Sequence, residues 1–162
     1  MAQQAAEQLH EACKEGQVAT IRQLLDGGVP VDALYRDSRT PLHTAIRYKQ
    51  REAVELLLDR GANIEALLEA EPLLWAFFNA ESEDLASLLL DRGASAHAVT
   101  AHGSTALHNA ADAGFLILIG RLIDMGLSVD VRSNTGSTPL MDAAYNGKKG
   151  ALEYLLGSRR KL

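Results

Sequence analysis

The chain has 162 residues, of which 47% are apolar and 5% aromatic, and its formal net charge is −5. This length fits a single domain, residues 1–162, with a core built mainly from Leu, Ala, Ile and Val. The negative charge argues against general nucleic-acid binding, because such binding depends on cationic side chains that neutralise phosphates.

The sequence carries no signal for a membrane or an oxidising compartment. The N-terminus lacks a basic stretch followed by an apolar one, so it does not resemble a signal peptide. Apolar runs such as residues 115–119 are far shorter than the roughly 20 residues that span a bilayer. Cys13 is the only cysteine and cannot form an intrachain disulfide. We therefore expect a cytoplasmic protein that does not bind membranes.

A pair of large aliphatic residues recurs along the chain in steps of 33, 32, 33 and 33 residues. The five copies are Leu24-Leu25, Leu57-Leu58, Leu89-Leu90, Leu122-Ile123 and Leu155-Leu156. A glycine follows each of the first four pairs in the same register. A fixed period of this length predicts a stack of structural repeats. The repeats are expected at about 3–34, 35–66, 67–99, 100–132 and 133–162.

Each repeat reads as two short helices. The first helix is expected to begin at a capping threonine followed by proline, as at Thr40-Pro41 and Thr138-Pro139. It should end at a glycine that adopts a left-handed conformation, as at Gly16, Gly114 and Gly147. The second helix leads into the aliphatic pair. One such antiparallel pair cannot bury its apolar face alone, so the repeats should stack into an all-α solenoid.

The segment Thr40-Pro41-Leu42-His43-Thr44-Ala45 resembles the signature of the ankyrin-repeat family. Residues 105–110 and 138–143 each depart from this signature once. The resemblance covers about residues 8 to 157. It implies helix pairs joined by β-turn or hairpin-like loops, with N- and C-terminal capping repeats. It also implies a protein-binding module that is a monomer when free.

No residue constellation points to catalysis, a metal or a cofactor. His10, His43 and His108 fall at the same position of three repeats, and the resemblance implies that they tie the turn backbone together. His97 and His102 flank one loop without a cysteine or carboxylate cluster at ligand spacing. Cys13 aligns with apolar or small residues, which indicates a buried thiol. We therefore expect a protein that is not an enzyme.

The third repeat, residues 67–99, departs most from the pattern. It contains the only tryptophan, Trp75, followed by Phe77 and Phe78, and it carries one basic and six acidic side chains. This acidic region lies between a basic stretch, residues 36–51, and a basic C-terminus. The electrostatic field of this charge distribution could orient a charged partner protein. A mixed solvated surface, with Arg39 near Glu71 across adjacent turns, is the alternative.

The resemblance implies that the turn tips and the inner helices line a concave face. The residues expected there are Arg36, Asp37, Arg39, Arg47, Tyr48, Glu69, Glu71, Phe78, Asn79, His102, Ser104, Asp112, Asn134, Thr135, Tyr145 and Asn146. The aromatic and arginine members are expected to dominate binding to a partner protein. Two functions fit this face: an inhibitor, adaptor or immunity-type partner, or a transient chaperone or assembly factor.

Overall fold

The computed structural model describes residues 2–35, 38–68, 71–72 and 82–159. The inner helices are α1 (Ala2–Glu15), α3 (Pro41–Arg47), α7 (Ala106–Ala113) and α9 (Pro139–Tyr145). The outer helices are α2 (Val18–Asp26), α4 (Arg51–Asp59), α6 (Glu83–Asp91), α8 (Leu116–Asp124) and α10 (Lys149–Arg159). Two short antiparallel strands, β1 (Leu67–Leu68) and β2 (Glu71–Pro72), form one hairpin tip. None of the described helices is long and apolar enough to cross a membrane.

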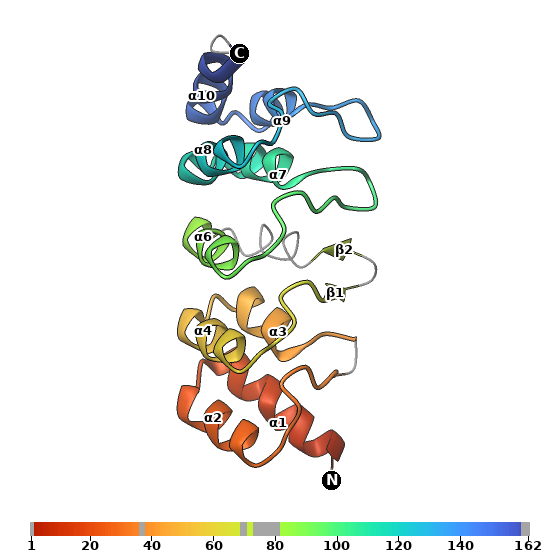
Figure 1. Cartoon of the computed structure of the whole chain (residues 1–162), viewed down its shortest axis with the longest axis vertical. Coiled ribbons are helices and arrows are strands. Elements are labelled where there is room, and N and C mark those ends of the chain that lie inside the picture. Colours follow the sequence, from red (N-terminus) through yellow and green to blue (C-terminus); the bar gives the residue numbers. More distant parts are fainter. Residues whose placement is uncertain (1, 36–37, 69–70, 73–81, 160–162) are drawn as a thin grey trace.

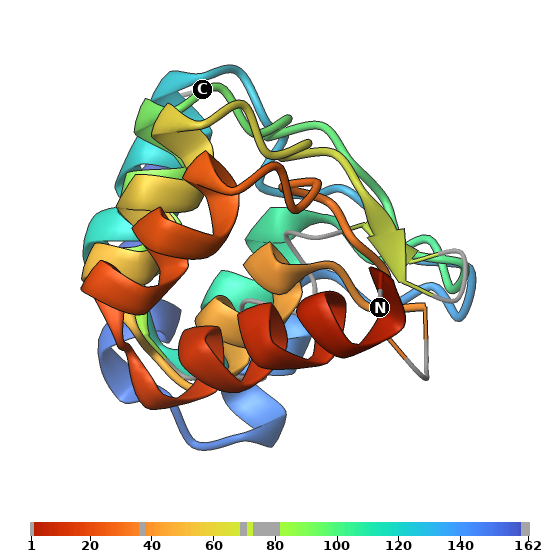
Figure 2. The same ribbon diagram turned by 90° about the horizontal axis from the view of Figure 1, so that it is seen from below.

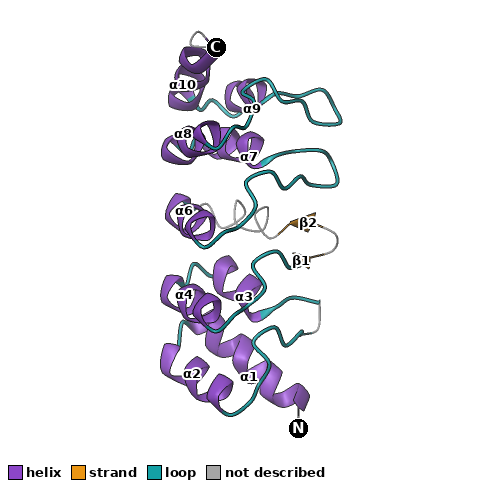
Figure 3. Ribbon diagram, viewed as in Figure 1, coloured by secondary structure: helices purple, strands orange, loops and turns teal. Residues whose placement is uncertain are grey.

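The helices form two layers along the length of the molecule (Figure 1). The inner helices α1 and α3 pack together, as do α7 and α9, and the outer helices stack beside them. The loops between repeats project from the helices toward one side (Figure 3), as the end-on view also shows (Figure 2). Isolated bridges pair Tyr35 with Arg39 and Val99 with Thr105 at two of these tips. The expected all-α solenoid with hairpin-like loops is confirmed.

Threonine precedes the inner helices α3, α7 and α9 as the sequence predicts. The Thr40 hydroxyl accepts a hydrogen bond from the His43 N–H, and the Thr40 N–H donates to His43 Nδ1 at 3.2 Å. Thr105 and His108 form the same reciprocal pair at the start of α7. The Thr138 hydroxyl accepts from the N–H of Met141, whose side chain cannot return the bond. Each cap satisfies N–H groups that the helix leaves without internal partners.

Left-handed residues end the inner helices. Gly16, Gly114 and Gly147 have φ of +67°, +82° and +64°, as expected from the glycine spacing. Lys49 takes the equivalent place in the second repeat with φ of +57°. Glycine adopts this conformation without a steric penalty, whereas lysine does not.

The repeated leucines form a continuous core. The side chains of Leu42, Leu57, Leu89, Leu107 and Leu122 are completely buried. The alanines that follow the inner leucines, such as Ala45, Ala110 and Ala143, are also completely buried. Their small side chains let neighbouring inner helices approach closely, as the sequence predicts.

Ion pairs between consecutive repeats run along the outer layer. They join Arg60 to Asp26, Arg92 to Asp59 and Arg121 to Asp91, at 2.8, 2.9 and 2.6 Å. All three aspartates are more than half exposed, so each pair contributes at most about 1 kcal/mol. The stack is therefore held mainly by its buried core, and these pairs add little to its stability.

Candidate functional site

The predicted concave face lies only partly within the described residues. Arg36, Asp37, Glu69, Phe78 and Asn79 lie outside them. Of Glu71, the structure describes the backbone in β2. The aromatic cluster expected at the centre of this face, residues 75–78, also lies outside the described part.

Most of the other predicted residues expose their side chains at the ends of inner helices or on the tips. The side chains of Tyr48 and Tyr145 are 45% and 90% exposed. Arg39 and Ser104 are half-buried. The remaining exposed members are Arg47, His102, Asp112, Asn134, Thr135 and Asn146. Exposed aromatic side chains on a rigid helical frame are suited to protein contacts, because little conformational entropy is lost on binding.

Two predicted residues from adjacent repeats bind each other. The Asn146 side-chain amide donates to the Asp112 carboxylate, which joins the end of α9 to the end of α7. Partial desolvation of the carboxylate and the nearby charge of Asp142 raise the pKa of Asp112. The Ser137 hydroxyl donates to Asp142. The ends of α7 and α9 therefore form an internally hydrogen-bonded surface that carries the carboxylates of Asp112 and Asp142.

Asn134 connects two neighbouring tips. Its backbone N–H donates to the carbonyl of His102 at 3.0 Å, and its side-chain amide donates to the carbonyl of Ala101 at 3.2 Å. A Cβ on Gly103 would lie 2.4 Å from the Asn134 side-chain oxygen, so glycine permits this close approach. Asn134 thus stabilises the loops in addition to being exposed.

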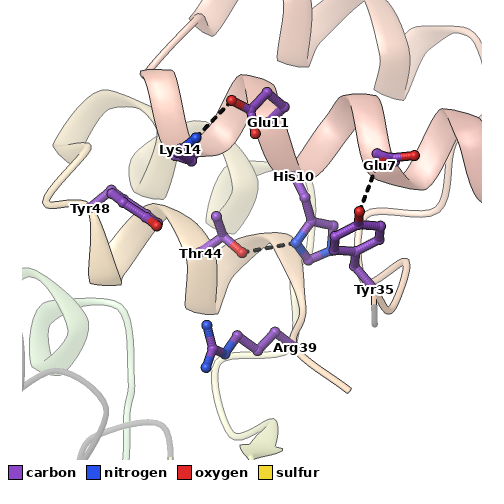
Figure 4. A pocket seen from close by; sticks show the side chains of 8 residues that line it. All are labelled: Glu7, His10, Glu11, Lys14, Tyr35, Arg39, Thr44 and Tyr48. Carbon is purple, nitrogen blue, oxygen red and sulfur yellow. Dashed lines mark hydrogen bonds and ion pairs between the residues drawn. The ribbon is translucent and has the colours of Figure 1, made fainter. Parts of the chain in front are cut away.

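A pocket of about 280 Å³ opens between α1 and α3 on the inner-helix side (Figure 4). Its lining combines acidic, basic and aromatic side chains: Glu7, His10, Glu11, Lys14, Tyr35, Arg39, Thr44 and Tyr48. The sequence-based site included only Arg39 and Tyr48 from this set. One feature of the sequence could have identified the pocket residues that come from α1. Glu7, Glu11 and Lys14 are spaced so that they lie on one side of a helix.

Hydrogen bonds hold the pocket walls in place. His10 Nε2 lies 2.8 Å from the carbonyl of Ala33, and His10 Nδ1 lies 2.8 Å from the Thr44 hydroxyl. Because a carbonyl only accepts, Nε2 carries the proton. The Tyr35 hydroxyl donates to Glu7 at 2.6 Å. These contacts link α1 to the first tip and to α3.

The charged rim of the pocket is partly neutralised. Lys14 Nζ donates to Glu11 at 2.8 Å and lies 6.0 Å from the centre of the Tyr48 ring. The hydrogen bond and charge of Glu11 raise the pKa of Lys14. The lysine therefore stays protonated and holds a cation beside an exposed aromatic ring.

The histidines at the repeated position tie the turns together. His43 and His108 bind their capping threonines, and His108 Nε2 also reaches the Ser137 carbonyl at 3.0 Å. This confirms the role that the family resemblance implied. His10 differs in the partner of Nδ1, which is Thr44 of the next repeat and not a capping threonine of its own repeat. Among the described residues, no three His, Cys, Asp or Glu side chains are grouped so that they could hold a metal ion.

Cys13 is completely buried, as its alignment with apolar positions predicts. Burial raises the pKa of its thiol to about 12. The thiol is therefore protonated at neutral pH and is a poor nucleophile.

The family model described as Ankyrin repeats (3 copies) matches residues 3–67 and 73–161. The chain belongs to the ankyrin-repeat family. Ankyrin-repeat proteins stack their repeats into extended surfaces for binding other proteins. The family is generally non-catalytic.

Three curated relatives extend this result. The mouse B-cell lymphoma 3 protein homolog is 35% identical over 142 residues, which cover 83% of this chain and 32% of the relative. The human B-cell lymphoma 3 protein is 36% identical over 141 residues, which cover 83% of this chain and 31% of that protein. The chain thus spans about a third of these relatives.

The third relative is an enzyme by name. Glycerophosphocholine phosphodiesterase gde1 of Schizosaccharomyces pombe is 36% identical over 105 residues, which cover 63% of this chain and 9% of that protein. So small a share of the enzyme gives no ground for assigning its activity to this ankyrin-repeat chain.

Proposed function

We propose that this ankyrin-repeat chain binds a partner protein through its concave face and acts as an inhibitor, adaptor or immunity-type partner. The observation that carries the proposal is the contrast between two sets of equivalent positions. Among the described residues, framework leucines and alanines of the inner repeats, such as Leu42, Ala45 and Leu107, are buried and recur with little change, whereas the exposed ends of the inner helices vary. A constant frame with a changing surface suits recognition of one particular partner.

The aromatic residues at the ends of α3 and α9 are the proposed anchors. Tyr48 follows the last residue of α3 and Tyr145 is the last residue of α9, and both side chains are exposed. The pocket beside Tyr48 offers room for a side chain of the partner, with Glu7 and Lys14 at its walls. Aromatic residues beside such pockets contribute much of the binding free energy in protein interfaces. Phe78, together with Arg39 and Arg47, completes the proposed anchor set.

We place this interaction in the cytoplasm, where the lone buried Cys13 needs no oxidising conditions. The alternative function is that of a transient chaperone or assembly factor. Dissociation kinetics separate the two, because an inhibitor is expected to stay bound for long periods and a chaperone to release its client rapidly.

The test is affinity capture from a native cell extract followed by mass spectrometry. The unmodified chain is compared with a Tyr48→Ala/Tyr145→Ala variant. Tyr154→Ala is the matched control, since Tyr154 is 44% exposed but lies on the outer helix α10. A partner captured by the unmodified chain and the control, and lost by the double variant, supports the proposal. Equal capture by the unmodified chain and both variants contradicts it.

A further inference from the structure

The second repeat carries residues other than glycine at both of its left-handed positions. Ser38 precedes α3 with φ of +59°, and Lys49 follows α3 with φ of +57°. The equivalent residues of the last repeat are Gly136 and Gly147. An L-amino acid is disfavoured in this conformation, because its Cβ crowds the backbone. The backbone is therefore strained at both ends of the second inner helix, where the last repeat avoids strain.

No contact within the described part of the chain compensates this strain. The side chains of Ser38 and Lys49 are exposed, and neither forms a hydrogen bond or an ion pair with a described residue. A cation near the end of a helix interacts favourably with the helix dipole, but Arg47 already supplies one in the last turn of α3. Strained backbone residues cluster at ligand-binding sites. The two residues thus mark the second repeat as a place of recognition.

The two strained residues flank the pocket between α1 and α3. Arg39, which directly follows Ser38, and Tyr48, which directly precedes Lys49, both line that pocket (Figure 4). A partner segment that places a side chain in the pocket therefore comes close to the strained residue at each end of α3. The strain, the pocket and the exposed Tyr48 ring all lie on one surface of the second repeat.

The charge of this surface is positive. Residues 36–51 include five basic side chains and one acidic side chain. Arg47 and Lys49 are exposed on either side of Tyr48, and neither forms an ion pair with any described residue. The nearest following carboxylate in the sequence, Glu52, pairs with neither of them. Two cations beside an exposed aromatic ring are complementary to carboxylates. The net charge of −5 disfavours a nucleic acid as the anionic partner.

We propose that the second repeat binds an acidic segment of the partner protein, with Asp or Glu carboxylates of that segment against Arg47 and Lys49. The segment crosses α3 toward Ser38, whose exposed hydroxyl can donate a hydrogen bond to it. This inference rests on the partner-binding function proposed above and specifies the chemistry of the partner. The carboxylates of Asp112 and Asp142 at the ends of α7 and α9 repel an acidic segment, so they direct it to the second repeat.

The test measures binding of a short fluorescein-labelled peptide rich in glutamate to the 162-residue chain by fluorescence anisotropy. The control probe is the same peptide with lysine in place of each glutamate. The acidic peptide is expected to bind and the basic peptide not to bind. The affinity for the acidic peptide should fall as the salt concentration rises, because salt screens the exposed cations.

Three substitutions of Lys49 separate its charge from its backbone strain. Lys49→Gln removes the charge and keeps a side chain, Lys49→Gly removes both charge and strain, and Lys49→Arg keeps the charge. The first two are expected to raise the dissociation constant about threefold and the third to leave it unchanged. Arg47→Gln/Lys49→Gln should raise it about tenfold. Lys149→Gln is the matched control, because the Lys149 side chain is 86% exposed but lies on the outer helix α10.

Four results would overturn the proposal. These are no binding of the acidic peptide, equal binding of the basic peptide, an unchanged dissociation constant for Arg47→Gln/Lys49→Gln, or an equal loss for Lys149→Gln. Circular dichroism checks that each variant is folded. If the acidic peptide fails to bind while Tyr48→Ala/Tyr145→Ala still loses a captured partner, the concave-face function stands and only the acidic partner is rejected. If the peptide binds through Lys49 while the tyrosine variant keeps its partner, the reverse holds.

Discussion

Lys49 adopts in the second repeat the left-handed backbone conformation that Gly147 adopts in the last, with φ of +57° and +64°. Both residues lie between an inner helix and the outer helix that follows. An L-amino acid in this region is disfavoured by about 1 kcal/mol, because its Cβ crowds the backbone. The second repeat therefore contains local strain that the last repeat avoids.

Lys49→Gly is expected to raise the free energy of unfolding by about 0.5–1 kcal/mol, since relief of strain exceeds the entropy that glycine loses on folding. The reverse change, Gly147→Lys, should lower it by about 1 kcal/mol. A Cβ at Gly147 would meet nothing within 4 Å, so this effect reports backbone conformation and not a clash. Urea unfolding, monitored by circular dichroism, measures the free energy of unfolding of both variants. Destabilisation by Lys49→Gly would refute the strain argument.

Most of the fold was predictable because the residues that define it repeat. The leucine spacing and the Thr-Pro signature locate the helices, and the spacing of Gly16, Gly114 and Gly147 locates the turns between them. The second repeat has lysine at the equivalent position, and its left-handed turn follows only by alignment. Local residue types decide these features, so the sequence was sufficient to predict them.

Contacts between repeats were harder to predict, because they depend on how neighbouring units rotate and on which rotamers face each other. The pairing of Asp112 with Asn146 and the wall that Tyr35 and Glu7 form in the pocket are of this kind. The expected proximity of Arg39 and Glu71 stays a prediction, since the Glu71 side chain lies outside the described part of the chain.

Asp112 should make stability depend on pH. Its pKa is raised in the folded state by burial and by Asp142. Its contribution to stability is therefore complete below the unfolded pKa of about 4 and is lost as pH rises through the higher folded value. Asp112→Asn is expected to leave the free energy of unfolding unchanged in acid and to raise it at pH 7. The melting temperature, measured at several pH values, tests this.

Asp142→Asn provides a second check on the same carboxylate, because it removes one of the two causes of the raised pKa while leaving Asp112 in place. The pH-dependent difference in melting temperature between the unmodified chain and Asp112→Asn should shrink when both proteins also carry Asp142→Asn. A difference that runs in the opposite direction with pH would show that Asp112 is stabilised as a carboxylate in the fold.

The cap of α7 should contribute measurably to stability. Thr105 is buried, and its N–H and hydroxyl both bind His108 Nδ1, at 3.1 and 3.0 Å. Thr105→Ala is expected to lower the free energy of unfolding by about 0.5–2 kcal/mol, because one hydroxyl partner of the buried His108 is lost. Thr105→Ser keeps the hydroxyl and should cost less. Equal losses in urea unfolding would assign the effect to the methyl group instead of the cap.

Cys13 offers a probe of local opening at the N-terminal repeat. Its thiol is completely buried and its pKa is raised to about 12, so the native chain should resist the thiol reagent DTNB at pH 8. Labelling requires the first repeat to open, and its rate should rise at urea concentrations below the global transition. Because the folded pKa exceeds the unfolded value, native stability should also fall as pH rises from about 9 toward 12.

The control places a thiol on the surface of the same repeat. Ala19 is exposed on α2, so a Cys13→Ala/Ala19→Cys variant should react with DTNB without any opening. Reaction of native Cys13 as fast as this variant would mean that the thiol is accessible in the folded chain. Each repeat of a solenoid is held only by its neighbours, so the first repeat can open alone. Reaction only at the global unfolding transition would mean instead that the first repeat opens together with the rest of the stack.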